Sequence, residues 1–495
     1  MNPHRKGGEN DRLPSGIQRL DYILKGGFFR GSTYGIVGPP GSGKTIFGNQ
    51  LCFNHVRQNA GNCVYITLLV ESHAKMFKHL SSLSFFDPSL IPDRLYYVSG
   101  YQTLCDHGFD GLQELVRKTL RERKASLCII DGLESADFAA KDDLGLREFI
   151  NELQGIATLT QCTTFLMSNG DHARQVQSSL VDGSIELTDR YAGPRAVREL
   201  TVTKFRGSDY LRGRHEVEIL DSGLSIHPRT EVQFDKPTGQ AFESRTRMRL
   251  GIPRLDEMLH GGIPSGSTTA LLGAPGTGKT VLGLAFLVEG ARQGQHGTYF
   301  GFYEPPPRLI EKASQVGLPL QQYVDEGLIN LIWQPPLEHM VDALSEQLLE
   351  PFREQKRERR RLFVDGIEGF RAASVYPDRM PRFLSALTNQ LRTLDVSTLV
   401  AEELELFKPD VTMPHPELAS VVENVLLLRY VELNSHLYRL LSIMKMRESS
   451  YDTSIREFRI GAGGIEVAES FESAEAILSG LPKRTCPPAR GGAGG

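Results

Sequence analysis

The chain has no run of about 18 apolar residues, which is the length that a helix needs to cross a bilayer. Its first residues, MNPHRKGGENDRLPSG, also lack the apolar core of a secretory signal peptide. The six cysteines form no CxxC pair, and the thirteen histidines show no HExxH spacing. We therefore expect a cytoplasmic protein with reduced thiols, no membrane contact and no metal site built from cysteine or histidine.

Positive and negative charges are also nearly balanced in the chain. The chain carries 56 Lys and Arg against 60 Asp and Glu, a net charge of -4, so no global basic field points to a nucleic-acid partner. Basic runs occur at Arg117–Lys124 and Arg353–Arg361, each just before an apolar stretch. We predict that both are solvated helix ends whose cations complement the helix dipole, with nucleic-acid contact as the alternative.

A long repeat dominates the sequence. GIQRLDYILKGGFFRGSTYGIVGPPGSGKT ends at Thr45, and GIPRLDEMLHGGIPSGSTTALLGAPGTGKT ends at Thr280. Later landmarks keep nearly the same offset: IIDGLE is matched by FVDGIE, and TKFRGS by MKMRES. A spacing of a whole domain predicts two homologous units rather than a solenoid. The predicted organisation is a flexible segment 1–12, domain 1 at 13–235, a linker 236–247, domain 2 at 248–480 and a disordered tail 481–495.

Short apolar runs alternate with amphipathic stretches within each unit. STYGIVG, CVYITLLV, SLCII and TTFLMSN have the length of buried strands, and IFGNQLCFNHVRQNA is typical of a helix. This alternation predicts an α/β fold in which a mostly parallel twisted sheet is flanked by helices. ELTVTKF and HEVEIL, late in domain 1, alternate in the manner of an antiparallel hairpin.

Two glycine-rich stretches, GPPGSGKT and GAPGTGKT, fit the phosphate-loop pattern GxxxxGK[ST]. Glycines let the backbone curl so that several N–H groups point at one phosphate, and the following helix adds its positive end. Lys44 and Lys279 would reach the β- and γ-phosphates of ATP, and Thr45 and Thr280 would supply a hydroxyl to Mg²⁺. The predicted ATP-binding residues are Gly38, Gly41, Ser42, Gly43, Lys44 and Thr45, and Gly273, Gly276, Thr277, Gly278, Lys279 and Thr280.

An acid follows one apolar strand in each domain. Asp131 comes after SLCII and Asp365 after LFV, and a carboxylate in this position can hold Mg²⁺. We predict that both aspartates belong to the metal site. Three residues further on stand Glu134 and Glu368, for which a solvated loop acid is the simpler interpretation.

With these motifs the chain resembles the KaiC family of ATPases, within the RecA-like superfamily. The resemblance spans about Leu13 to Phe471 and is strongest in KMRESSYDTSIREF. It implies a double-ring hexamer with ATP bound between neighbouring subunits. Residues i and i+2 of a strand share a face, so each K-x-R pair presents two cations side by side. The resemblance implies that these pairs reach the neighbour's γ-phosphate, with a serine close by, which gives the in-trans set Lys204, Arg206, Ser208, Lys445, Arg447 and Ser449.

The sequence departs from the family at one catalytic position. KaiC domains carry two adjacent glutamates after the strand beside the phosphate loop, and this chain has LLVES and FGFYEPP there. Glu71 and Glu304 match the second acid, whereas Val70 and Tyr303 replace the first. We predict a catalytic role for Glu71 and Glu304, beside Lys44 and Lys279, with an electrostatic role as the alternative. The prolines after Glu304 are expected to end the strand just past that acid.

The phospho-acceptor region departs as well. The resemblance places an adjacent Ser-Thr pair where this chain has Ala419 and Ser420, so Ser420 is the candidate that remains. An ordinary helix or loop serine is the alternative for it.

The expected function is a KaiC-like ring protein that binds two ATP per chain with Mg²⁺ and hydrolyses it slowly. The expected partners are further copies of the chain, as a homo-hexamer, and a protein of a signalling pathway. Alternatives left open are a catalytically quiet ATP-gated scaffold, a recombinase-like DNA-dependent ATPase and a weak Ser/Thr autokinase.

Overall fold

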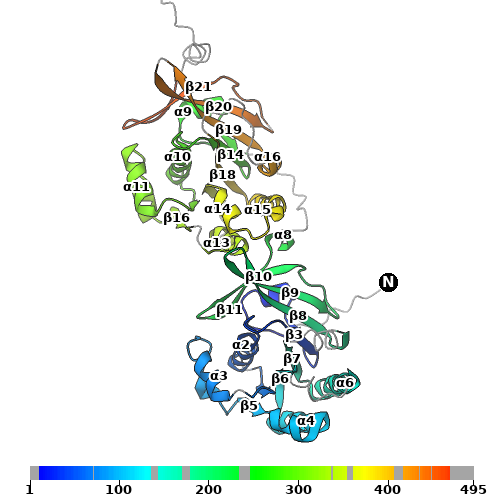
Figure 1. The fold of residues 1–495 in the computed structure, drawn as a ribbon. Coiled ribbons are helices and arrows are strands. Elements are labelled where there is room, and N and C mark those ends of the chain that lie inside the picture. The colour runs from blue at the N-terminus through cyan, green and yellow to red at the C-terminus, as the bar shows by residue number, and fades with distance from the viewer. Residues whose placement is uncertain are drawn as a thin grey trace, which may run out of the picture. The chain divides into compact units, whose positions relative to one another are not determined.

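The computed structural model describes residues 11–58, 60–70, 72–134, 143–169, 179–233, 246–335, 338–353, 360–405, 416–433, 435–447 and 449–468. The chain divides into two compact units, Met1–Gln233 and Phe234–Gly495. Each unit carries a nine-stranded sheet with helices on both faces (Figure 1). The predicted fold class, two tandem α/β domains, is therefore confirmed. Within the described residues, no helix is long and apolar enough to cross a membrane.

The sheet of domain 1 has the order β11-β10-β9-β8-β3-β7-β6-β4-β5. From β8 to β5 all neighbours are parallel, and β9, β10 and β11 add an antiparallel extension. The pairing of β9 with β10 confirms the predicted hairpin. The elements are β1 (Arg12–Leu13), α1 (Leu20–Ile23), β2 (Phe28–Phe29), β3 (Thr33–Val37), α2 (Lys44–Arg57), β4 (Asn62–Thr67), α3 (His73–Leu80), η2 (Pro88–Leu90), β5 (Leu95–Ser99), α4 (Tyr101–Arg123), β6 (Ala125–Asp131), α6 (Asp143–Thr160), β7 (Thr163–Ser168), β8 (Gly183–Ala192), β9 (Arg195–Phe205), β10 (Arg214–Leu220), β11 (Gly223–His227) and α8 (Thr230–Gln233).

The sheet of domain 2 repeats this plan in the order β16-β15-β17-β18-β14-β19-β20-β21-β22. Its parallel part runs from β16 to β19, and its antiparallel part from β20 to β22. The elements are β12 (Arg247–Met248), α9 (Pro253–Met258), β13 (Ile263–Pro264), β14 (Thr268–Gly273), α10 (Lys279–Arg292), β15 (Gly297–Gly301), α11 (Pro306–Gln315), α12 (Leu320–Asp325), β16 (Ile329–Trp333), α13 (Val341–Arg353), β17 (Arg360–Asp365), α14 (Glu368–Ala373), η3 (Pro377–Arg379), α15 (Met380–Thr393), β18 (Val396–Glu403), α16 (Pro416–Val421), β19 (Asn424–Leu433), β20 (His436–Met446), β21 (Arg456–Gly461) and β22 (Gly464–Val467).

The central apolar strands are buried on both faces, as is typical of a parallel sheet covered by helices. Along β6, Leu127 and Ile129 join the core under α2, whereas Cys128 and Ile130 join the core under α4 and α6. Burial of each of these leucine and isoleucine side chains contributes roughly 1.5–3 kcal/mol. The two helical layers fix the sheet between them, and they fix the loops at the carboxyl ends of its strands.

The structure describes five of the six cysteines. Cys52, Cys63, Cys128 and Cys162 are buried free thiols, and Cys105 is a free thiol on the surface. Cys486 lies outside the described residues.

The basic run before β17 corrects one prediction. The cations at the end of α4 are solvated, as predicted, but Arg360 and Arg361 belong to a strand and are buried. Buried arginine is tolerated when its donors find acceptors. Arg361 donates to Gln295 Oε1 at 2.8 Å and to two backbone carbonyls, and its guanidinium lies 4.6 Å from the Phe286 ring centroid. The strand therefore begins two residues before the apolar letters LFV.

The prolines after Glu304 act differently from the prediction. The strand β15 already ends at Gly301, and the prolines occupy the entry of α11, with Pro306 and Pro307 in its first turn. Proline suits this place because the first helical N–H groups have no partner within the helix. Glu304 consequently lies in a loop between strand and helix, not at a strand end.

Two short strands lie at the edges of the predicted segments. β1 includes Arg12, from the segment predicted to be flexible, and β12 begins at Arg247, the last residue of the predicted linker. The tail 481–495 and residues 236–245 lie outside the described residues, so those predictions stay predictions.

Candidate nucleotide-binding site

Each phosphate loop joins the central parallel strand to a helix. Gly38–Thr45 connects β3 with α2, and the loop before Thr280 connects β14 with α10 in the same way. Gly41 and Gly43 have φ angles of 84° and 96°, in the left-handed region that glycine adopts without penalty, and the matching glycines of domain 2 do the same. The conformation that the motif requires is therefore formed twice.

The two loop lysines are buried against their own loops. Lys44 Nζ donates to the carbonyl oxygens of Gly38 at 2.7 Å and Pro39 at 2.9 Å. Lys279 donates to the two matching carbonyls at 2.7 and 3.0 Å. Burial lowers the pKa of both ammonium groups, and nearby carboxylates oppose that shift. Each lysine is a desolvated cation, which strengthens its attraction for a phosphate.

A threonine and an aspartate meet beside each lysine. Thr280 Oγ1 lies 3.4 Å from Asp365 Oδ1, and Thr45 Oγ1 lies 3.5 Å from Asp131 Oδ2. Burial raises the pKa of both aspartates. Hydroxyl and carboxylate oxygens are the hard ligands that suit Mg²⁺. Among the described residues no group of three or more His, Cys, Asp or Glu could hold a metal. The pair fits a Mg²⁺ that takes its other ligands from nucleotide and water.

Two tyrosines in these sites were missed by the sequence analysis. Tyr65 OH donates to Asp131 at 2.6 Å, and Tyr299 OH donates to Asp365 at 3.1 Å. Both tyrosines stand on the neighbouring parallel strand at matching places of the repeat. The recurrence of a tyrosine at the same position of both repeats could have indicated this role from the sequence. The tyrosines orient the carboxylates, as partners of metal ligands commonly do.

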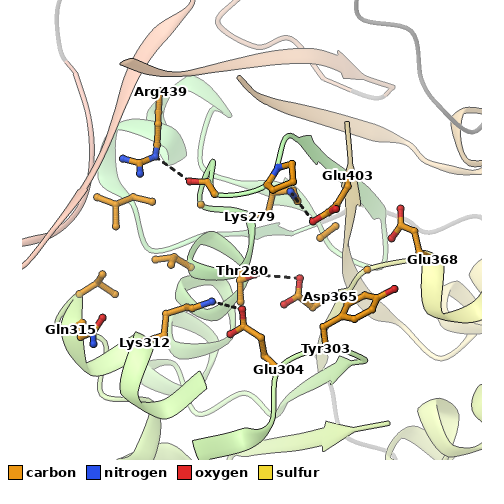
Figure 2. Close-up of a pocket in the computed structure, with 18 residues that line it drawn as sticks. Lys279, Thr280, Tyr303, Glu304, Lys312, Gln315, Asp365, Glu368, Glu403 and Arg439 are labelled. Atoms are coloured by element: carbon orange, nitrogen blue, oxygen red, sulfur yellow. Dashed lines mark hydrogen bonds and ion pairs between the residues drawn. The ribbon is translucent and has the colours of Figure 1, made fainter. Parts of the chain in front are cut away.

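A cavity opens in front of each loop. The cavity of domain 2 measures about 610 Å³ and that of domain 1 about 340 Å³. Figure 2 shows Lys279, Thr280 and Asp365 converging on the larger one, with Glu403 facing the lysine at 4.0 Å. Asn169 lines the smaller cavity at the place that corresponds to Glu403.

Glu304, one of the two predicted catalytic acids, lies in the larger cavity but is paired with a cation. Its carboxylate accepts a hydrogen bond from Lys312 of α11, and its other oxygen is buried with no hydrogen-bond partner in the described structure. Tyr303, at the position of the missing acid, also lines the cavity. Glu71, the matching acid of domain 1, lies outside the described residues. No local sequence pattern indicates Lys312, because the pairing depends on the direction in which α11 leaves the loop.

The cations proposed to act in trans do not belong to the described lining of either cavity. Lys204 Nζ donates to the Ser179 carbonyl at 3.1 Å, and Arg206 forms a 3.8 Å ion pair with Asp182. In domain 2, Lys445 Nζ donates to the Val422 carbonyl at 2.9 Å. Lys204 and Lys445 lie near the ends of the antiparallel strands β9 and β20, but Arg206 and Arg447 come just after those strands, so neither pair is contained in a strand as predicted.

The serines near these cations lie in different surroundings. Ser208 Oγ accepts from Arg12 at 2.8 Å, whereas Ser449 Oγ is buried without a hydrogen-bond partner among the described residues. Ser420 is exposed near the end of α16, and its carbonyl accepts from Arg447 at 3.4 Å. The structure thus brings the candidate phospho-acceptor beside one of the cations predicted to act in trans.

Fold and site together define a class of protein. A phosphate loop at the carboxyl end of a central parallel strand, with a Thr-Asp pair beside its lysine, is the arrangement of P-loop nucleotide-binding proteins. It is present in both units of this chain, so the chain is a tandem P-loop protein.

Comparisons with known proteins give the family. The family model described as "ATPase: KaiC" matches residues 13–231 and 248–472, so the chain belongs to the KaiC family of ATPases. The circadian clock oscillator protein KaiC of Parathermosynechococcus lividus is 26% identical over 488 residues, which are 95% of this chain and 88% of that protein. The proteins of the same name from Parasynechococcus marenigrum (26% identical; 96% and 93% of the two chains) and Synechocystis sp., there called KaiC 1 (25%; 94% and 91%), are similar at the same level.

Proposed function

We propose that the chain binds one Mg²⁺–ATP in each domain and hydrolyses it slowly at the interfaces of a homo-hexamer. The observation that carries the proposal is the convergence of Lys279, Thr280 and Asp365 on one cavity, repeated by Lys44, Thr45 and Asp131. The names of the relatives connect those proteins with a circadian clock. By analogy, we propose that this chain acts in the cytoplasm and that its binding to a signalling protein depends on whether ATP or ADP is bound.

The residues take separate roles in this proposal. The loop N–H groups and Lys44 or Lys279 bind the phosphates, while Thr45 and Asp131, or Thr280 and Asp365, hold Mg²⁺. The metal supplies neutralisation of phosphate charge when it is bound. The K-x-R pairs reach the γ-phosphate of the neighbouring subunit, with Ser208 and Ser449 near the nucleotide. Support for a role in trans is that these cations are not part of the described lining of their own chain's cavities.

A quiet ATP-gated scaffold is the second candidate. It is favoured by one observation: Glu304 is engaged with Lys312, and Tyr303 replaces the acid that should stand beside it. Weak autophosphorylation at Ser420 and DNA-dependent hydrolysis are further outcomes that the same sample can reveal.

The mass of the assembly, measured with and without ATP, tests the proposal when phosphate release is read from the same sample. The proposal expects an ATP-dependent hexamer with slow release that DNA does not stimulate. Hexamers without release would establish the scaffold instead. A chain that stays monomeric with ATP and Mg²⁺ would contradict the interface sites. Phosphosite mapping shows whether Ser420 is modified.

A further inference from the structure

The sequence D-G-x-E after β6 and β17 brings a second acid into each nucleotide cavity. Glu134 lines the cavity of domain 1, and Glu368 lines that of domain 2. The glycine between the two acids, Gly132 or Gly366, has a φ of 93° or 99°. Only glycine adopts this left-handed turn freely, and here the turn lets the chain continue so that the glutamate faces the same cavity as the aspartate. These glutamates are therefore not simple solvated loop acids.

Both glutamates lie within electrostatic reach of the phosphate-binding lysine. Burial lowers the pKa of Lys44, and the negative charges of Asp131 and Glu134 act against that shift. For Lys279 the opposing carboxylates are Glu403, Asp365 and Glu368. A carboxylate with this placement faces the region in which the γ-phosphate of a bound nucleotide would lie.

The structure also shows what positions each glutamate. Glu134 accepts two hydrogen bonds from Asn169, from the side-chain amide at 2.7 Å and from the backbone N–H at 3.2 Å. Glu368 begins α14, and one of its oxygens lies 3.5 Å from the point that a Cβ on Gly366 would occupy. The carboxylate thus folds back over the turn. In domain 1 the acid is fixed by a neutral amide rather than by an ion pair.

Glu304, the other candidate catalytic acid of domain 2, is held in an ion pair. Figure 2 shows Glu304 directed toward Lys312, whereas Glu368 lies on the opposite side of Asp365, near Tyr303 and Glu403. A carboxylate held in an ion pair is less available to orient a water molecule. Within the described residues, Glu134 and Glu368 form no ion pair, whereas Glu304 does, and Glu71 lies outside those residues.

We propose that Glu134 and Glu368 are catalytic carboxylates that orient the attacking water and accept its proton. This rests on the proposed ATPase function. The water oxygen forms a bond to the γ-phosphorus, and the bond from that phosphorus to the β–γ bridging oxygen breaks, its electron pair leaving with ADP. The water proton passes to the glutamate and then to solvent, so ATP and water yield ADP, phosphate and a proton, with no further reactant.

The double variant Glu134→Gln/Glu368→Gln tests the proposal in the full chain. Phosphate release should fall about 100-fold or more, the usual contribution of a general base, while a fluorescent ATP analogue still binds at wild-type affinity. The matched control Glu122→Gln/Glu326→Gln changes two exposed glutamates on α4 and after α12, and it should keep the wild-type rate. A glutamine double variant that binds the analogue and retains the wild-type rate would overturn the proposal.

A second comparison separates this inference from the sequence prediction and from the proposed function. Glu71→Gln/Glu304→Gln should lose less activity than Glu134→Gln/Glu368→Gln, and the reverse order would overturn the inference. If Lys44→Ala/Lys279→Ala releases as much phosphate as wild type, the proposed ATPase itself fails. If the glutamine variant does not bind the analogue, Glu134→Asp/Glu368→Asp replaces it. That variant should bind and lose about tenfold or more in rate, because its carboxylate is one carbon short, and a wild-type rate would refute the role.

Discussion

Asp256 shows at the residue scale why both halves of the chain contain the letters R-L-D. Its carboxylate accepts the backbone N–H of Leu250 at 2.7 Å and of Gly251 at 3.2 Å. Asp21 accepts from Ser15 and Gly16 in the same way. These bonds fix the entry of the chain into each domain. The motif that helped to reveal the repeat is therefore structural, and it touches neither cavity in the described lining.

The buried position of Asp256 predicts a pH-dependent stability. Burial raises its pKa from 3.8 to about 6, so the folded state favours the protonated form. The resulting stabilisation is complete below the unfolded value and is lost as pH rises through about 6. We expect Asp256→Asn to flatten the fall in melting temperature between about pH 4 and pH 6, the interval in which only the folded state holds the proton. The exposed Asp378→Asn serves as control, and an unchanged slope in Asp256→Asn would show that another group titrates.

At the scale of the elements, the start of the first phosphate loop packs so closely against β8 that Gly38 leaves no room for a Cβ atom. A Cβ on Gly38 would lie 2.2 Å from the carbonyl oxygen of Leu187 on β8. Gly155, in α6, has no atom within 4 Å of the corresponding point. The same substitution should therefore act in opposite directions at these two glycines.

Gly38→Ala should destabilise domain 1 by about 1–3 kcal/mol, because backbone would have to shift. Gly155→Ala should stabilise it by about 0.5–1 kcal/mol, because alanine is the better helix former. Denaturant midpoints of the two variants against wild type measure both effects. Equal midpoints for Gly38→Ala and wild type would mean that the loop is not so closely packed.

The elements also show how far the sequence could lead. The phosphate loops and the strand-end aspartates are recognised from local sequence patterns that occur twice, so the fold class and the main site residues could be predicted from the sequence. The pairing of Glu304 with Lys312 could not, since it depends on the direction of α11. The burial of Arg361 could not either, because its acceptors come from residues 66, 75 and 112 positions away. The identity of a charged residue does not predict that acceptors so distant in the sequence will surround it.

At the scale of the whole molecule, each domain supplies a phosphate loop, a Thr-Asp pair beside its lysine and a K-x-R pair. The pairs lie outside the described lining of the chain's own cavities. In a ring of identical chains, each K-x-R pair could contact the nucleotide bound in the cavity of the neighbouring subunit.

Mixed rings test this arrangement. Lys445→Ala/Arg447→Ala should lose the phosphate release that domain 2 contributes because the in-trans cations are gone, and Lys279→Ala should lose it because the phosphate loop no longer binds ATP productively. In a mixture, an intact K-x-R pair from one variant can meet an intact phosphate loop from the other. Phosphate release by the mixture should exceed the mean of the two variants. A mixture equal to that mean would exclude action in trans.

Steady-state phosphate release by the purified chain, compared with Lys44→Ala, Lys279→Ala and the double variant, tests the central claim most directly. The account predicts slow release by wild type, partial loss in each single variant and background release in the double variant. Equal release by wild type and the double variant would contradict hydrolysis at these two sites.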